Sequence, residues 1–208
     1  QQQQQQQQQP SDTSGSQQQK TDNTKTNKST KMNKEEYLEH VARKLSMKAK
    51  DAGHSDKLGI AEALVQLGEV LMKEHKFSSS INILGRAETV HKEIIHETIL
   101  AVASAMKRQG QLHQAKGNHE LAKLYLNTAA ELKGSPSAAN LKKAWEVHTE
   151  HKPRRSKDTE LKEAVAKVER RLKRASSEAV PLAHTLKLLA KAKRGEIATK
   201  SLRRSNYR

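Results

Sequence analysis

The sequence predicts an all-α fold, and three observations support that prediction. From Glu35 onward Leu, Ala, Glu, Lys, Gln and Arg dominate, and all of them favour helices. Apolar residues recur at three- and four-residue spacing, which places them on one face of a helix. β-branched residues occur singly, without the sustained alternation of apolar and polar residues that is typical of strands. We therefore expect antiparallel helices joined by short polar turns.

Residues 1–34 are predicted to be a disordered tail. Residues 1–9 are all Gln, and residues 10–34 continue mainly in Gln, Ser, Thr, Asn, Asp, Lys and Gly. A segment of this composition cannot bury enough apolar area to offset the loss of chain entropy on folding. The chain opens with Gln and Met32 is a candidate internal start, so the sequence is compatible with a fragment or a processed form.

Positive charge is concentrated in the last quarter of the chain. Residues 152–208 contain 18 lysines and arginines against six acidic side chains, a net charge of +12 out of the formal +16 of the whole chain. Residues 35–151 are close to neutral, with 16 basic and 15 acidic side chains. We therefore divide the chain into a tail (1–34), a packed helical domain (35–151) and a basic helical region (152–208).

Composition disfavours several classes of protein. The chain has no cysteine, which excludes disulfides and thiolate zinc sites. No run approaches the roughly 20 apolar residues of a membrane-spanning helix, and the N-terminal residues lack the order of a signal peptide. One Phe, one Trp and three Tyr are too few for the stacking platforms of single-strand-binding proteins. We expect an intracellular protein, with cytoplasm and nucleus both open.

Local signals place the first three helices. Asn33 can cap a helix that has two glutamates in its first turn and ends near Gly53. A second helix is expected from about Asp56. A polar turn over residues 75–78 then precedes a third helix, with Ser78 as its N-cap.

Two stretches within residues 60–132 resemble the tetratricopeptide repeat, a helical hairpin that recurs along a chain. The matching positions of the first copy are Leu67, Gly68, Leu71, Phe77, Ser80, Leu84 and Ala87. A second copy follows 42 residues later, at Gly110, Leu112, Gly117, His119, Ala122, Leu126 and Ala129. A third is hinted at by Ala164, Val165 and Val168, but it fails at Arg171. No Gly or Pro separates Ala87 from Gly110, so we expect the long period to extend the helices without adding a loop.

The resemblance implies an adaptor without catalytic activity. In that family the first helices of successive hairpins line a groove that receives a peptide or helix of a partner. The implied groove residues are Glu62, Val65, Glu69, Met72 and Lys73 in the first copy and Ser104, Lys107, Gln111 and Gln114 in the second. Val65 and Glu69 stand where members that clamp a terminal carboxylate carry Lys, Asn or Arg, so the chain departs from that pattern. An unrelated helical bundle gives the same Leu, Gly and Ala spacing and stays the alternative.

Further breaks follow the repeat zone. Gly134 and Pro136 end it, and Ser137 or a neighbour opens a helix that Pro153 stops. Trp145, the only Trp, is expected to pack as a cap on the end of the hairpins and not to stand exposed as a binding anchor.

Two basic helices are predicted beyond residue 157. Asp158 or Thr159 caps the first, and Pro181 lies near the start of the second, where a missing N–H costs little. We expect their apolar stripes to pack against each other and on the hairpins, leaving a solvated basic face. Such a face can bind the backbone of RNA or DNA, an acidic protein surface or, less readily, an anionic membrane. The candidate polyanion-binding residues are Lys152, Arg154, Arg155, Lys157, Lys167, Arg170, Arg171, Lys173, Arg174, Lys191, Lys193, Arg194, Arg203 and Arg204.

Motifs for catalysis are missing from the sequence, which has no phosphate-binding loop, dinucleotide fingerprint, zinc-protease motif or serine-hydrolase motif. His148 and His151 can share a helix face but lack further ligands, so we expect them to be solvent-exposed. Ser156, Ser176 and Ser205 follow basic pairs, a context that basophilic kinases use. We expect a protein-binding adaptor with no catalytic residue, metal, cofactor or small-molecule substrate. The alternative is a nucleic-acid-associated protein that acts through residues 152–208.

Overall fold

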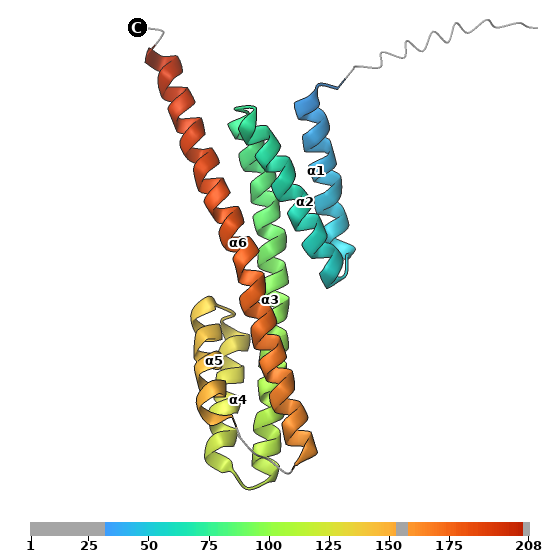
Figure 1. Cartoon of the computed structure of the whole chain (residues 1–208), viewed down its shortest axis with the longest axis vertical. Helices are drawn as coiled ribbons and strands as arrows, with labels where there is room; N and C mark the ends of the chain where they lie inside the picture. The colour runs from blue at the N-terminus through green and yellow to red at the C-terminus, as the bar shows by residue number, and fades with distance from the viewer. Residues whose placement is uncertain (1–31, 153–157, 206–208) are drawn as a thin grey trace, which may run out of the picture. The chain divides into compact units, whose positions relative to one another are not determined.

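Figure 1 shows the computed structural model, which describes residues 32–152 and 158–205, without the side chains of residues 203–205. These residues form helices and no strand, so the all-α prediction is confirmed. The helices are α1 (Lys34–Asp51), α2 (His54–Lys73), α3 (Phe77–Ala115), α4 (His119–Gly134), α5 (Ala138–His151) and α6 (Thr159–Ser205). The predictions for residues 1–31, for Pro153 and for the side chains of Arg154, Arg155, Ser156, Lys157, Arg203, Arg204 and Ser205 lie outside the described part.

Two long antiparallel helices, α3 and α6, pack along each other. With 39 and 47 residues, they are about 58 and 70 Å long. α1 and α2 pack on the N-terminal half of α3, α4 packs on its C-terminal half, and α5 packs against α4 and α6 (Figure 1). We call α1 and α2, with the parts of α3 and α6 beside them, the first bundle. The second bundle consists of α4 and α5 with the remaining parts of α3 and α6.

Each bundle has its own apolar core. The first contains Ala42, Ala49, Ile60, Ala61, Leu64, Leu71, Ile83, Ala87, Val90 and Ile94. The second contains Ile99, Val102, Ala103, Ala105, Met106, Tyr125, Ala129, Leu132, Leu141, Ala144, Val147, Val168, Leu172 and Ala175. Burial of one Leu or Ile side chain stabilises a fold by about 1.5–3 kcal/mol. The apolar residues of the two cores therefore determine which face of their helices turns inward.

Predicted helix starts agree with the structure where the signal is local. Asn33 and Glu36 exchange two side-chain-to-backbone hydrogen bonds of 2.8 and 3.2 Å, which begins α1 with a capping box. Ser137 and Asp158 each accept a hydrogen bond from the backbone N–H three residues later, at 3.2 and 2.9 Å. The prediction for Ser78 is wrong, because α3 begins one residue before it and has no side-chain cap.

α3 is one unbroken helix from Phe77 to Ala115. This confirms that the residues between Ala87 and Gly110 add no loop. The second helix of the first predicted hairpin and the first helix of the next are consequently halves of the same helix. The α2–α3 and α3–α4 hairpins share α3, where separate hairpins would have a turn.

The turns of the two hairpins are alike. His75 and Gly117, which are 42 residues apart, both have positive φ, 59° and 76°. After each of them, the next backbone N–H donates to the carbonyl five residues earlier at 2.9 Å, the bond that closes a helix before a left-handed residue. Gly117, a matching position of the second predicted copy, therefore lies at the turn of its hairpin.

Each hairpin also has a glycine where its helices approach closely. A Cβ on Gly68 would lie 2.6 Å from Cγ of Leu84, and a Cβ on Gly110 would lie 2.9 Å from Cγ of Leu126. Gly110 and Leu126 each lie 42 residues after their counterparts Gly68 and Leu84. The sequence pattern thus coincides with a recurring helix–helix contact, and the relation to the tetratricopeptide family stays a prediction.

α6 is a single helix where two were predicted, and Pro181 lies inside it. Proline in a helix interior removes a hydrogen bond and costs about 3 kcal/mol. The helix continues because its buried face continues on both sides of the proline, with Leu172 and Ala175 before it and Leu189 and Ala192 after it. The first predicted stripe packs on α3, and the two stripes do not pack against each other. Of the second stripe, Leu189 packs on α3, whereas Leu186 and Ala190 are exposed.

Candidate functional site

An open groove lies between α3 and α4 in the second bundle. Its volume is about 480 Å³ and its lining is mostly apolar. The lining residues are Leu100, Ala103, Ser104 and Lys107 of α3 and Leu126, Ala129, Ala130 and Lys133 of α4. The three alanines leave space between the helices, and the two leucines provide apolar surface. We call this recess the α3–α4 groove.

Lysines stand at both edges of the α3–α4 groove. Lys107 on α3 and Lys133 on α4 are exposed, and Lys123 is exposed about one turn before Leu126. Neither Lys107 nor Lys133 forms an ion pair with another described residue. No acidic side chain is among the lining residues. The groove therefore has an apolar floor and a positive rim.

The groove continues the line along which α1 packs. α1 lies on α3 beside Arg86 and Glu93. Seven-residue steps from these two positions lead to Leu100 and Lys107, on the same stripe of a packed helix. α1 ends at Asp51, about halfway along α3 (Figure 1). The side of α3 that borders α1 in the first bundle thus has no such neighbour at the groove, although Arg86 and Glu93 themselves stay exposed beside α1.

The first hairpin shows how a helix covers the equivalent of Leu126. That equivalent is Leu84, which is fully buried in a cluster with Leu189 and Ala192 of α6. Leu126 is only half-buried. Leu189 and Ala192 of α6 thus cover Leu84 in the first hairpin. The matching Leu126 of the second hairpin borders the α3–α4 groove instead.

The predicted groove residues of the second copy lie together. Ser104 and Lys107 line the α3–α4 groove, and Gln111 and Gln114 follow them along α3. All four side chains are exposed. The structure adds the α4 side of the groove, which the sequence pattern identified only as packing residues.

The predicted groove residues of the first copy lie on α2, and α6 covers part of this set. Oε1 of Glu69 is 3.5 Å from Nε2 of His184 on α6. Met72 packs against the cluster that contains Leu84 and Leu189. The remaining members are Glu62 and Lys73, which are exposed, and Val65, which is half-buried. The structure therefore does not bring the two halves of the predicted groove into one continuous open surface.

Several predicted polyanion-binding residues are engaged inside the protein. Lys152 and Lys173 both pair with Glu169, the latter at 3.0 Å between Nζ and Oε1. Hydrogen bonds from these two lysines lower the pKa of Glu169 to about 2. Arg171 donates a hydrogen bond to the backbone carbonyl of Ala101 on α3. These contacts hold α6 against the second bundle and neutralise part of the basic region.

Other predicted polyanion-binding residues remain exposed, without an acidic partner among the described residues. They are Lys167 and Arg170 in the N-terminal half of α6 and Lys191, Lys193 and Arg194 in its C-terminal half. Ser176, one of the predicted kinase sites, is also exposed on this helix.

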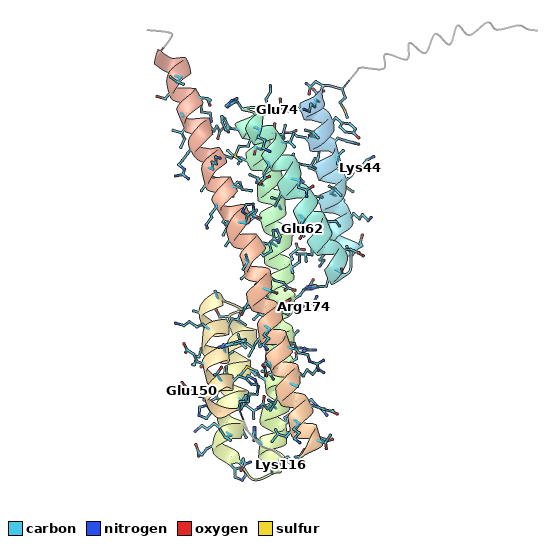
Figure 2. All side chains as sticks on the ribbon, in the orientation of Figure 1. Lys44, Glu62, Glu74, Lys116, Glu150 and Arg174 are labelled. Atoms are coloured by element: carbon cyan, nitrogen blue, oxygen red, sulfur yellow. The ribbon has the colours of Figure 1, made fainter. Side chains whose placement is uncertain are left out.

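A buried polar network joins α2, α3 and α6, and no sequence signal indicated it. Glu178 is 7% exposed and is hydrogen-bonded to Thr98 at 2.5 Å, to His54 at 2.6 Å and to Arg174 at 2.9 Å. Burial alone would raise the pKa of Glu178, but these three hydrogen bonds outweigh burial and lower it. Figure 2 shows Arg174 in the N-terminal half of α6, at the level where the two bundles meet.

Buried histidines are a second feature that the sequence did not reveal. His148 is 3% exposed, so the expectation that it faces solvent is wrong: it lies on the inward face of α5, beside the core residues Ala144 and Val147. His113 of α3 is 2% exposed and stacks on Tyr125 of α4, with ring centroids 5.5 Å apart. Burial lowers the pKa of both histidines and raises that of Tyr125 to about 12.

Two further predictions on α5 have mixed outcomes. His151 is half-buried, with Nδ1 3.1 Å from the carbonyl oxygen of Val147. Trp145 is 37% exposed, which differs from the packed cap that was predicted.

Comparison of the chain with protein-family models, curated proteins and solved structures finds no match. Among residues 32–152 and 158–205, no helix combines the length and the apolar character that crossing a bilayer requires. In the same residues, no three His, Asp or Glu side chains gather closely enough to hold a metal ion.

Proposed function

We propose that this protein is a non-enzymatic binding scaffold whose α3–α4 groove receives an amphipathic helix of a partner protein. One observation carries the proposal: the groove is open and apolar, has lysines on both edges, and continues the side of α3 that borders α1 in the first bundle. A helix is the occupant because α1 already packs along that side of α3. Helix-in-groove binding is a common mode of recognition between proteins.

The chemistry of the groove defines the partner helix. Its apolar stripe enters between α3 and α4, in the way that Leu189 and Ala192 of α6 pack on Leu84. Its flanks are acidic, because Lys107 and Lys133 border the groove and complementary charge favours association. The expected pattern is therefore Leu and Ala at three- and four-residue spacing, with Glu or Asp on either side.

A designed peptide tests the proposal. It has the 18-residue length of α1, a Leu and Ala stripe and glutamates on both flanks, and a matched peptide carries lysine in place of each glutamate. Binding to the full chain is measured by fluorescence anisotropy. We expect the acidic peptide to bind at least about tenfold more tightly than the basic one, since two lysines flank the groove.

Substitutions locate the binding site. Lys107→Glu combined with Lys133→Glu should remove the preference for the acidic peptide, and Ala130→Trp should fill the groove and weaken both peptides. Lys142→Glu on α5, where the lysine side chain is 80% exposed, is the matched control and should change nothing. Failure of the acidic peptide to bind, or binding that is indifferent to the groove substitutions, would refute the proposal.

The nucleic-acid alternative finds less support. Of its predicted residues, Lys152 and Lys173 pair with Glu169, and Arg171 binds a backbone carbonyl. In the C-terminal half of α6, exposed apolar side chains lie beside the basic ones, and a phosphate backbone would not contact apolar side chains favourably.

A further inference from the structure

The C-terminal half of α6 has exposed apolar side chains on its outer side. Leu186 is 42% exposed and Ile197 is 66% exposed. At 100° per residue, the 11-residue step between them turns through about three full circles, so both lie on the same side of the helix. Ala183 and Ala190 lie within about 60° of this line and are also exposed. These four residues form the centre of what we call the outer face of α6.

Basic side chains lie both beside and within the outer face. Helical geometry places Lys187, Lys191 and Arg194 along one edge, whereas Lys193 and Lys200 lie within about 40° and 60° of Leu186 and Ile197, and all five are exposed. The acidic residue in this stretch, Glu196, lies on the inner side, where it borders a recess beside the α2–α3 turn and pairs with Lys200 at 2.9 Å. The outer face therefore combines two large exposed apolar side chains with several cations, and the carboxylate found between residues 179 and 202, Glu196, lies off this face.

We propose that the outer face of α6 binds an anionic membrane surface. An apolar stripe with Lys and Arg beside it is typical of helices that lie in the interface of a bilayer, where the apolar side chains enter the acyl boundary. The long lysine and arginine side chains of this face reach the lipid phosphates. The inner side of the same helix packs on α3, so the whole folded chain would rest on the bilayer.

The arrangement favours lipid over nucleic acid. A duplex is bound mainly through its phosphates, which offer nothing to apolar side chains. Leu186 and Ile197 lie among the cations of this face, and contact with a phosphate backbone would leave both without an apolar partner. The proposal does not depend on the α3–α4 groove, which lies on other helices.

Vesicle sedimentation with the full chain tests the proposal. We expect binding to vesicles of phosphatidylcholine with about 30% phosphatidylserine, weakening as salt is added, and no binding to phosphatidylcholine alone. Leu186→Ser with Ile197→Ser should weaken binding at least about tenfold, because two apolar side chains no longer enter the bilayer. Changing Lys187, Lys191 and Arg194 to Gln should weaken it about fivefold per cation.

Matched controls distinguish binding through the outer face of α6 from binding through exposed apolar or basic side chains elsewhere on the protein. Met47→Ser on α1 removes a side chain that is 68% exposed, and Lys142→Gln on α5 removes an exposed cation, and neither should alter vesicle binding. Thermal unfolding followed by circular dichroism checks that each variant folds. Absence of binding to anionic vesicles, or vesicle binding that the double serine variant retains, would overturn the proposal. Tighter binding to a duplex RNA than to anionic vesicles would overturn it in favour of nucleic acid.

Discussion

Two residues with left-handed backbone end the first helix of each hairpin. His75 has φ of 59° and Gly117 has φ of 76°. A Cβ in this region approaches the following carbonyl oxygen, which costs roughly 1–2 kcal/mol for most residues and nothing for glycine. His75 contacts the edge of the Phe77 ring, with ring centroids 5.7 Å apart, and this contact offsets part of the cost. The turn between α2 and α3 therefore stores strain that the turn between α3 and α4 does not.

Substitutions at these two turn residues should change the free energy of unfolding in opposite directions. His75→Gly should raise the free energy of unfolding by about 0.5–1 kcal/mol, because the strain is relieved at the cost of the ring contact. Gly117→Ala should lower it by about 1 kcal/mol, because alanine meets the same backbone strain. Urea unfolding followed by circular dichroism measures both. A His75→Gly variant less stable than the parent would show that the Phe77 contact dominates.

At the scale of helices, starts that have a side-chain cap could be predicted, whereas the continuation of α6 through Pro181 could not. A cap needs only a side chain and a backbone N–H three residues later, so Asn33, Ser137 and Asp158 could be identified from the sequence. Pro181 predicted a break, but the packing of α6 on α3 on both sides of the proline outweighs its local cost. The partners of Glu178 lie on three different helices, and no local pattern reports their meeting.

The polar network at Glu178 gives the prediction at this scale. Glu178→Ala leaves Thr98, His54 and Arg174 without their shared acceptor, and should lower the free energy of unfolding by about 2–4 kcal/mol. Glu178→Gln keeps a carbonyl acceptor and should cost less than the alanine change. Glu163→Ala, an exposed carboxylate on the same helix, is the control and should stay within about 0.5 kcal/mol of the parent. Equal stability of Glu178→Ala and the control would contradict the role assigned to the network.

At the scale of the whole molecule, the site was only partly predictable. Ser104 and Lys107 followed from the repeat pattern, because the groove face of a hairpin is set by its own periodicity. The cover over Glu69 and Met72 depends on where α6 docks, which is a contact between distant parts of the chain. Lys133 completes the positive rim only because α4 packs beside α3. The open half of the predicted groove could therefore be distinguished from the covered half only in the folded chain.

Three buried histidines make the stability of the whole fold sensitive to pH. Burial lowers the pKa of His91, His113 and His148, whereas the unfolded chain binds protons at a pKa near about 6.5. As the pH falls below that value the unfolded state gains protons and the folded state does not, so the free energy of unfolding decreases. The loss per histidine is at most about 1.4 kcal/mol for each unit by which its pKa is lowered.

Urea midpoints at about pH 7.5 and about pH 5.5 measure this effect, and we expect the lower midpoint at the lower pH. The carboxylates whose pKa values are lowered titrate below this window and do not contribute to it. His148→Met removes one buried titrating group and should reduce the difference between the two midpoints. A midpoint that is the same at both pH values would contradict the burial of these side chains.

The central claim is that the α3–α4 groove holds a helix, and amide chemical shifts of the isotopically labelled full chain test it most directly. During titration with the acidic amphipathic peptide, we predict that the largest shifts fall in residues 100–107 of α3 and 126–133 of α4, with little change on α2 or on the outer face of α6. Shifts that cluster on another surface, or no shifts at peptide concentrations well above that of the protein, would contradict the claim.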